Sequence, residues 1–319
     1  MFAFFIKERY NTNMKNLEYY LKKARLEKFA IGAFNFNNME TLKAICEAAE
    51  IEKSPVMVAM SENALKYMGL EFTVGMFNSA KKRYKAPMFL HLDHGASYEM
   101  CKTCIDAGFD SVMIDGSALP FKENVKLTKK VVAYAHKKNV LVEGEIGVLA
   151  GVEDDVQSDV HHYTNPAEAK AFVDATGVDL LAVAIGTSHG AYKFSGTPKL
   201  EFNILSQIEK LLPNFPIVLH GASTVSEKHV EKINSLGGEV KGSAGVPEKL
   251  LKKAFTQHNV CKVNTDTDIR IAFTAGVREV LTNSKKEIDP RKYLSKGQNE
   301  VYEVVKFKIR NVFLSSNKM

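Results

Sequence analysis

The stretch FLHLDHGAS (89–97) places the imidazoles of His91 and His94 around the carboxylate of Asp93, behind an apolar run. Imidazole nitrogens bind transition metals, and a carboxylate beside them can move protons. The stretch therefore suggests three uses: a metal site, an acid–base group, or a polar cap on a buried strand. His91 lies two positions before Asp93, deeper in the same strand, and we expect it to be an interior polar group.

Further candidates stand in or after other apolar segments. Glu143 and Glu145 lie in VLVEGEIG, His189 follows DLLAVAIG, and His220 ends PIVLH. Three imidazoles at strand ends, including His94, could bind a catalytic zinc and leave a position open for water or substrate. None of them lies in a local ligand motif such as H-E-x-x-H, and each alone is more simply explained as a hydrogen-bonded structural histidine. The zinc hypothesis therefore depends on their meeting in space.

Two late segments, HGAST (220–224) and NTDTD (264–268), offer phosphate-binding chemistry. Loop amides and hydroxyls after the last strands of a barrel often hold a phosphate, and glycine permits close backbone approach. The alternative for NTDTD is a polar helix cap. The donors we expect to contribute are Gly221, Ser223, Asn264 and Thr267, with positive charge from Lys193 and Arg270.

A third segment, GVLAGVEDD (147–155), is glycine-rich and acidic. It is long for a connection between a strand and a helix, and such loops are often mobile and functional. Its carboxylates, Glu153, Asp154 and Asp155, are either a general base on a lid or solvated side chains.

The elements that must position these groups are short apolar segments, predicted as strands, that alternate with segments of helical periodicity. Eight such units favour a closed (β/α)8 TIM barrel, with extra helices at the termini, over an open doubly wound sheet. Neither G-x-G-x-x-G nor G-x-x-x-x-G-K-[ST] occurs, which removes support for nucleotide binding. The carboxyl ends of barrel strands meet at one face, where the candidates would converge. The predicted strands span residues 29–37, 54–61, 86–94, 110–117, 140–147, 179–186, 216–223 and 260–267.

Composition narrows the class of protein. The 319 residues are 45% hydrophobic and 25% charged, with a net charge of +6 from scattered lysines, so we expect neither nucleic-acid nor membrane partners. The four cysteines form no disulfide or zinc-ribbon pattern, and we predict a cytoplasmic protein. Residues 14–319 are predicted to form one catalytic domain. Residues 1–13 are predicted to be a dispensable extension, because Met14 opens an amphipathic helix.

The motifs HLDHG, EGEIGVLAGVEDD, AIGTSHGAYK, VLHGAS and VNTDTDIR together resemble the class II, metal-dependent fructose-bisphosphate aldolases, a family that includes tagatose-bisphosphate aldolases. The likeness runs from about Met14 to the C-terminus. It implies a (β/α)8 barrel that uses zinc to cleave a ketose bisphosphate into dihydroxyacetone phosphate and glyceraldehyde 3-phosphate. Fructose 1,6-bisphosphate is the expected substrate, and tagatose 1,6-bisphosphate is the alternative. The resemblance also implies a homodimer or a homotetramer.

The resemblance assigns roles to residues. Asp93 would be the acid–base group at the C4 oxygen, and Glu153 would handle the proton at C1. The zinc ligands would be His94, His189 and His220, with Glu145 at an alternative metal position. The substrate and its phosphates would be held by Ser61, Gly190, Lys193, Gly221, Ser223, Asn264, Asp266, Thr267, Asp268 and Arg270. The backbone around Gly190, Gly221 and Ser223 resembles the family's site for a monovalent cation, Na⁺ or K⁺. Val152 stands where the family often has another acidic residue before EDD.

Two rival hypotheses remain. A class I aldolase would need a Schiff-base lysine, for which Lys193 and Lys262 are weak candidates. A non-catalytic binding protein on a retained barrel would have lost ligand or carboxylate positions, and none is lost in this sequence.

Overall fold

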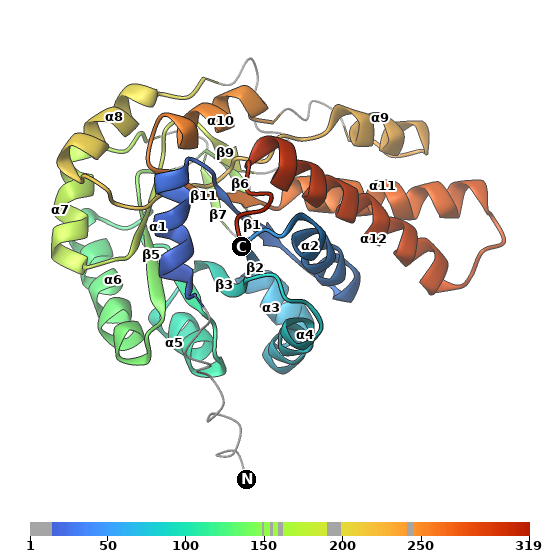
Figure 1. The fold of residues 1–319 in the computed structure, drawn as a ribbon, viewed down its shortest axis with the longest axis horizontal. Helices are drawn as coiled ribbons and strands as arrows, with labels where there is room; N and C mark the ends of the chain where they lie inside the picture. Colours follow the sequence, from blue (N-terminus) through green and yellow to red (C-terminus); the bar gives the residue numbers. More distant parts are fainter. Residues whose placement is uncertain (1–14, 149, 154–155, 159–161, 190–198, 241–244) are drawn as a thin grey trace, which may run out of the picture.

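Eight parallel strands close into a barrel in the computed structural model, which describes residues 15–148, 150–153, 156–158, 162–189, 199–240 and 245–319 (Figure 1). The neighbours follow the order β1-β11-β10-β8-β5-β4-β3-β2, so the predicted TIM barrel and all eight predicted strands are confirmed. The strands are β1 (Ile31–Asn35), β2 (Val56–Ser61), β3 (Met88–Gly95), β4 (Ser111–Ile114), β5 (Leu141–Ile146), β8 (Leu180–Val183), β10 (Ile217–Leu219) and β11 (Val260–Thr265).

Most of the helices surround the barrel (Figure 1), and their buried side chains are mainly apolar. Helix α7 shows how local sequence sets a start: Asn165 accepts hydrogen bonds from the amides of Ala167 and Glu168, and Pro166 occupies the first turn. None of the helices in the described part of the chain is long and apolar enough to cross a membrane. The helices are α1 (Leu17–Glu27), α2 (Met39–Glu52), α3 (Glu62–Met68), α4 (Leu70–Arg83), α5 (Tyr98–Ala107), α6 (Phe121–Ala135), α7 (Pro166–Thr176), α8 (Phe202–Leu211), α9 (Glu227–Ser235), α10 (Glu248–Thr256), α11 (Thr267–Asn283) and α12 (Pro290–Phe307).

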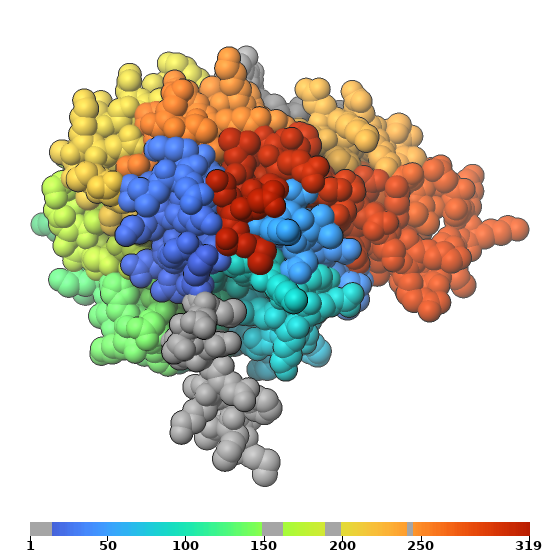
Figure 2. Space-filling view, in the orientation of Figure 1, coloured from blue at the N-terminus to red at the C-terminus, as the bar shows by residue number. Residues whose placement is uncertain are grey.

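Helix α1 closes the amino-terminal end of the barrel. Its buried residues Leu17, Tyr20, Leu21 and Ala24 pack in one apolar cluster with the first inward residues of the strands, among them Phe89. The C-terminal segment lies beside α1 on this face, as Figure 2 shows. A hydrogen bond joins α1 to the C-terminal segment, because Lys23 Nζ donates to the carbonyl of Lys318 at 2.8 Å. The floor of the barrel is therefore apolar and sealed.

Helices α11 and α12 form an antiparallel hairpin that projects from the barrel (Figure 1). They cross where Gly276 faces Gly297. A Cβ on Gly276 would lie 2.7 Å from the carbonyl oxygen of Lys296, so a larger residue would push the helices apart.

A small sheet stands beside the barrel, in the order β7-β6-β9. Strands β6 (Ala150–Glu153) and β7 (Val156–Ser158) are antiparallel, and Gly151 pairs with His189 of β9 (Ser188–His189). The segment 147–155, predicted as a loop, thus contains a strand. Strand β6 is defined by its pairing with β7 and β9, which local sequence does not show.

Candidate active site

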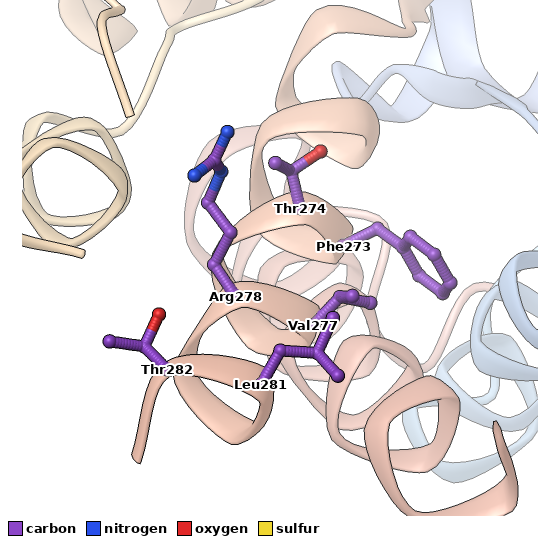
Figure 3. A pocket seen from close by; sticks show the side chains of 6 residues that line it. All are labelled: Phe273, Thr274, Val277, Arg278, Leu281 and Thr282. Carbon is purple, nitrogen blue, oxygen red and sulfur yellow. The ribbon is translucent and has the colours of Figure 1, made fainter. Parts of the chain in front are cut away.

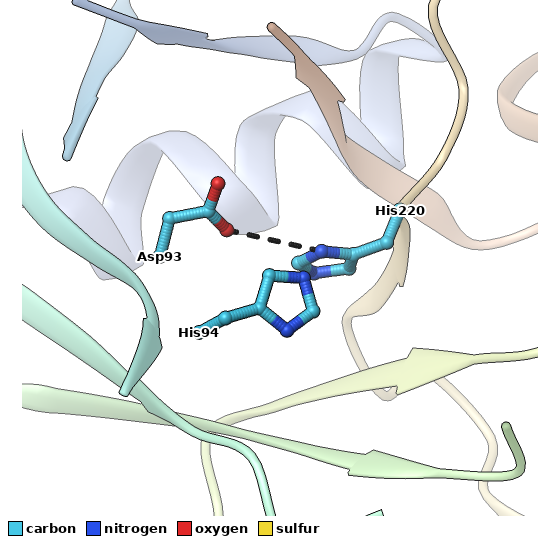
Figure 4. A group of neighbouring side chains, drawn as sticks. All are labelled: Asp93, His94 and His220. Atoms are coloured by element: carbon cyan, nitrogen blue, oxygen red, sulfur yellow. Dashed lines mark ion pairs between the residues drawn. The ribbon is translucent and has the colours of Figure 1, made fainter. Parts of the chain in front are cut away.

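Asp93, His94 and His220 meet at the carboxyl ends of β3 and β10. One ligand atom of each lies within 4.8 Å of the others, a grouping that can hold a metal ion. The two rings are 4.5 Å apart between centroids, and Asp93 Oδ1 lies 3.8 Å from His220 Nδ1 (Figure 4). His94, Asp115 and Glu145 form a second group of this kind. Two of the three imidazoles predicted to converge, those of His94 and His220, therefore meet here beside Asp93.

Both the backbone and the side chain of His94 determine where its ring lies. Its φ of 52° lies in the left-handed region, which is uncommon for any residue except glycine. The ring is then held by Asp115, whose Oδ2 lies 2.9 Å from Nδ1. A hydrogen on Nδ1 leaves Nε2 as the atom that can bind a metal.

The charge state of His94 follows from its neighbours. Burial would lower its pKa, but the hydrogen bond to Asp115 and the negative charges of Asp93 and Asp115 raise the pKa to about 10. The ring is therefore a cation when no metal is bound. A metal would have to displace that proton.

Asp93 is fixed by two amides and is 1% exposed. Asn35 donates to Oδ2 at 2.8 Å, and Asn264 donates to Oδ1 at 2.7 Å. Burial would raise the pKa of Asp93, but the positive charge of His94 and the hydrogen bond from Asn35 outweigh it and lower the pKa. The carboxylate stays ionised and can accept a proton.

His220 is held through its other nitrogen. Glu143 Oε1 lies 2.6 Å from Nε2, and the amide nitrogen of Asn264 lies 3.2 Å from Nδ1. Burial, with the charges of His94 and Lys262, lowers the pKa of His220 well below its usual value. The ring is neutral and has a lone pair for a ligand.

His91 and Lys262 lie one layer below, each two residues before a site residue on its own strand. His91 is fully buried, as predicted for an interior polar group, and its Nδ1 lies 2.7 Å from Ser111 Oγ. The Nζ of Lys262 donates to Glu143 Oε2 at 2.8 Å and lies 3.1 Å from His91 Nε2. A Schiff base needs a neutral amine that can reach a carbonyl. The engaged, buried ammonium of Lys262 does not meet that requirement.

Glu145 provides the test of whether the residues fit a metal. Its Oε2 is buried and has no hydrogen-bond partner among the described residues, although buried polar atoms are rarely unpaired. Burial and the charge of Asp115 raise the pKa of Glu145 well above its usual value. A cation here would replace the proton and satisfy the oxygen. Two imidazoles with carboxylates suit a borderline cation such as zinc.

The small sheet brings two predicted residues to this end of the barrel. His189 on β9 and Glu153 on β6 belong to adjacent strands, although their side chains lie outside the described part of the structure. Gly221, with φ of 58°, lets the chain after β10 pass close to β9, since a Cβ there would lie 2.6 Å from the Ser188 carbonyl. Glycine at position 221 thus lets β9 and the loop after β10 lie close together, and its predicted role toward a phosphate stays a prediction.

The predicted phosphate-binding residues are spread around the same face. Ser61, at the end of β2, is buried and caps α3 by accepting from the amide of Ala64. Ser223 is buried, and Thr267 begins α11, whose amino-terminal amides could bind an anion. Gly190 and Lys193 lie outside the described residues.

Asp268 and Arg270 are engaged within the protein. Asp268 is buried, accepts from the amide of Thr224 at 3.0 Å and pairs with Lys308 at 2.8 Å. Arg270 pairs with Asp266 on the same helix at 2.6 Å, and its side chain is half exposed. Asp268 is therefore placed to support the loop after β10.

Sequence reasoning did not identify Asn35 and Asp115 as part of the site, left Glu143 without a role, and considered Lys262 only as a weak Schiff-base candidate. Asn35 and Asp115 do stand at the carboxyl ends of predicted strands, which is a usable signal. The pairing of Lys262 with Glu143 joins positions 119 residues apart and could not be read from local sequence.

The chain matches the family model described as "Fructose-bisphosphate aldolase class-II" over residues 15–318. It is 47% identical to the fructose-bisphosphate aldolase of Treponema pallidum, covering 91% of this chain and 93% of the relative. It is 50% identical to the fructose-bisphosphate aldolase of Thermus caldophilus, covering 90% and 93%. A Helicobacter pylori relative of the same name is 46% identical, covering 94% and 97%.

Solved structures agree with this match. The YdjI aldolase from Escherichia coli K12 superposes with a TM-score of 0.78 at 29% identity, over 95% of this chain and 98% of that one. A putative fructose-1,6-biphosphate aldolase from Coccidioides immitis gives 0.78 at 29% identity, over 94% and 96%.

Proposed function

Because this chain belongs to the class II fructose-bisphosphate aldolase family, it is a metal-dependent lyase that reversibly cleaves fructose 1,6-bisphosphate, and we propose that its reaction centre is built on Asp93, His94 and His220. The products are dihydroxyacetone phosphate and glyceraldehyde 3-phosphate. The observation that carries the proposal is the meeting of the Asp93 carboxylate with both imidazoles at the top of the barrel.

The metal is proposed to be zinc, held by His94, His189 and His220, with Glu145 at an alternative position. The donor set of imidazoles and carboxylates supports this choice. When bound, such a metal acts as a Lewis acid that stabilises the negative charge developing as the C3–C4 bond breaks.

Asp93 is proposed to take the proton from the C4 hydroxyl during cleavage and to return it during synthesis. Three features support the role: the lowered pKa, the burial, and the two amides that fix the carboxylate. Each amide occupies one carboxylate oxygen, so a second lone pair on either oxygen is left for the substrate.

Glu153 is proposed to handle the proton at C1 of the three-carbon ketone. Its position on β6, which pairs with the strand of His189, supports a place beside the reacting carbons. The β6–β7 hairpin would exclude water when substrate is bound.

The phosphates are proposed to bind to loop amides, hydroxyls and nearby charges after the late strands, with a monovalent cation near Gly190, Gly221 and Ser223. The amino terminus of α11 and the buried loop after β10 support this placement. Asp268 is proposed to contribute to substrate binding as well, while it holds that loop through Thr224. The contributing residues are Ser61, Gly190, Lys193, Gly221, Ser223, Asn264, Asp266, Thr267 and Arg270.

Replacement of Asp93 by Ala tests the centre. Turnover should fall by about 10² to 10⁴-fold because no base then accepts the proton of the C4 hydroxyl, and the zinc content should remain about one ion per chain. Zinc content is measured by atomic absorption and turnover by coupled assay. Turnover within a few-fold of wild type would refute the role of Asp93.

Two controls separate the mechanisms and the sugars. A chelator should inactivate the enzyme, whereas borohydride with substrate should not, since it traps only a Schiff base. Cleavage of fructose and tagatose bisphosphates by one zinc-loaded preparation should favour fructose, in keeping with the names of the relatives.

We also propose that the enzyme is a homodimer or a homotetramer. The projecting helix α11 carries a hollow of about 500 Å³ on its surface, and three of its six lining residues, Phe273, Val277 and Leu281, are apolar (Figure 3). An apolar stripe on a projecting hairpin suits a contact with a second copy. Sedimentation equilibrium gives the mass, and a monomer at micromolar concentration would refute this proposal.

A further inference from the structure

We infer that Lys262 is a positioning residue for His220, on which it acts through the carboxylate of Glu143. The inference rests on the proposed function, in which His220 binds the metal. It assigns a purpose to a buried cation whose hydrogen-bond partners among the described residues are Glu143 and His91.

The three side chains form one chain of contacts across the barrel interior. Lys262 Nζ donates to Oε2 of Glu143 at 2.8 Å, and Oε1 of the same carboxylate lies 2.6 Å from His220 Nε2. The side chains of Lys262 and Glu143 are fully buried, and that of His220 is 1% exposed. The carboxylate is therefore a bridge whose two oxygens have different partners.

The bridge selects which nitrogen of His220 is available. Asn264 donates through Nδ2 to the carboxylate of Asp93, so its amide orientation is fixed. The same Nδ2 lies 3.2 Å from His220 Nδ1, which must then hold a lone pair. The hydrogen of His220 is on Nε2 and points to Glu143. Nδ1, the atom on the Asp93 side, keeps a lone pair that a metal could bind in place of the Asn264 amide.

A lysine is needed because Glu143 is far from solvent. A buried carboxylate without a counter-charge is strongly unfavourable, and Lys262 supplies that charge together with a directed hydrogen bond. A second acceptor, His91 Nε2, lies 3.1 Å from Lys262 Nζ and helps to orient the ammonium. Since an ammonium only donates, His91 carries its hydrogen on Nδ1 and directs it to Ser111 Oγ at 2.7 Å.

The spacing along the strands indicates that these buried residues form a layer directly beneath the site. Lys262 precedes Asn264 by two residues, His91 precedes Asp93 by two, and Glu143 precedes Glu145 by two. Side chains two apart on a strand share a face, so the buried trio lies directly below the site on the same interior wall.

Lys262→Met tests the inference, with Lys308→Met as the matched control. Both remove a buried ammonium from a buried carboxylate, but Asp268, the partner of Lys308, is bonded to Thr224, whereas Glu143 is bonded to His220. Affinity for Zn²⁺, measured by chelator competition, should fall about 10 to 100-fold in Lys262→Met and stay within about 3-fold in Lys308→Met. The visible spectrum of bound Co²⁺ should change only in Lys262→Met.

Glu143→Gln and the double variant Lys262→Met/Glu143→Gln keep the test decisive if Lys262→Met does not fold. Removing both charges avoids an unpaired buried carboxylate. If Lys262 acts through Glu143, the double variant should match Glu143→Gln in Zn²⁺ affinity and Co²⁺ spectrum. A further loss of about tenfold in the double variant, or native Zn²⁺ affinity in folded Lys262→Met, would overturn the inference.

His220→Ala separates this inference from the proposed function. Native Zn²⁺ affinity in His220→Ala would refute the proposed metal ligand itself. Loss of Zn²⁺ binding in His220→Ala with native binding in Lys262→Met would refute only the role of Lys262.

Discussion

At the scale of the residue, one ring nitrogen of His94 and one of His220 is bonded to a carboxylate of the protein, and the other nitrogen of each ring can bind a ligand. Asp115 takes the Nδ1 hydrogen of His94, and Glu143 takes the Nε2 hydrogen of His220. Carboxylates in this position orient a metal-binding ring and strengthen its binding. The position of each histidine ring therefore depends on an acidic residue outside the proposed set of substrate-binding residues.

Asp115→Asn should weaken Zn²⁺ binding by about 10 to 100-fold, because an amide oxygen holds the His94 ring less firmly than a carboxylate does. Chelator competition measures the change. Ser117→Ala is the control, since Ser117 donates only to the far oxygen of Asp115 and should alter the affinity by less than about 3-fold. Equal losses in both variants would contradict the role of Asp115.

At the scale of the element, helix α9 is tied to the α11–α12 hairpin by a cluster of charges. Glu300 of α12 pairs with Lys232 of α9 at 2.9 Å, with Lys296 at 3.0 Å and with His229 at 3.1 Å. Burial would raise the pKa of Glu300, but these hydrogen bonds lower the pKa to about 2. The cluster thus stabilises the fold while Glu300 is ionised.

Glu300→Gln should lower the free energy of unfolding by about 1 kcal/mol at pH 7, a value that allows for partial solvent screening. A lowered folded-state pKa means that the contribution is complete above the unfolded-state pKa, near 4.5, and is lost as the pH falls toward 2. Urea unfolding at pH 7 and pH 3 measures this loss. Glu303→Gln, an exposed neighbour, should show no such difference.

At the scale of the whole molecule, the barrel is layered along its axis. The floor is apolar and closed by α1, the middle layer contains Lys262, Glu143 and His91, and the proposed reaction centre is at the top. Stability and chemistry therefore reside at opposite ends, as is usual for this fold.

Tyr20→Ala should test that separation. Loss of a buried aromatic ring that packs against Phe89 should lower the free energy of unfolding by about 3 kcal/mol, with kcat and Zn²⁺ affinity unchanged in the folded protein. Tyr19→Ala, at an exposed neighbouring position, should be much milder. A large fall in Zn²⁺ affinity in Tyr20→Ala would show that the two ends are coupled.

The sequence predicts the architecture because apolar strand runs and helical stripes are local patterns, as with β5 and α7. It predicts that Asp93, His94 and His220 lie close together, because the carboxyl ends of barrel strands meet at one face. It does not predict the Lys262–Glu143 contact or the Asp115–His94 contact, because these depend on the stagger between strands. It also does not predict β6, which is held by its pairing with β9.

The left-handed backbone at His94 implies a trade-off between stability and function. A φ of 52° disfavours every residue with a side chain by about 1 kcal/mol relative to glycine, so the metal-free enzyme is strained at the position where it needs an imidazole. His94→Gly should therefore be more stable to urea than His94→Ala by about 1 kcal/mol, the reverse of the usual order in a strand. Glycine at this position would avoid the backbone cost but lose the imidazole, so a single torsion angle sets local stability against function at the proposed metal site.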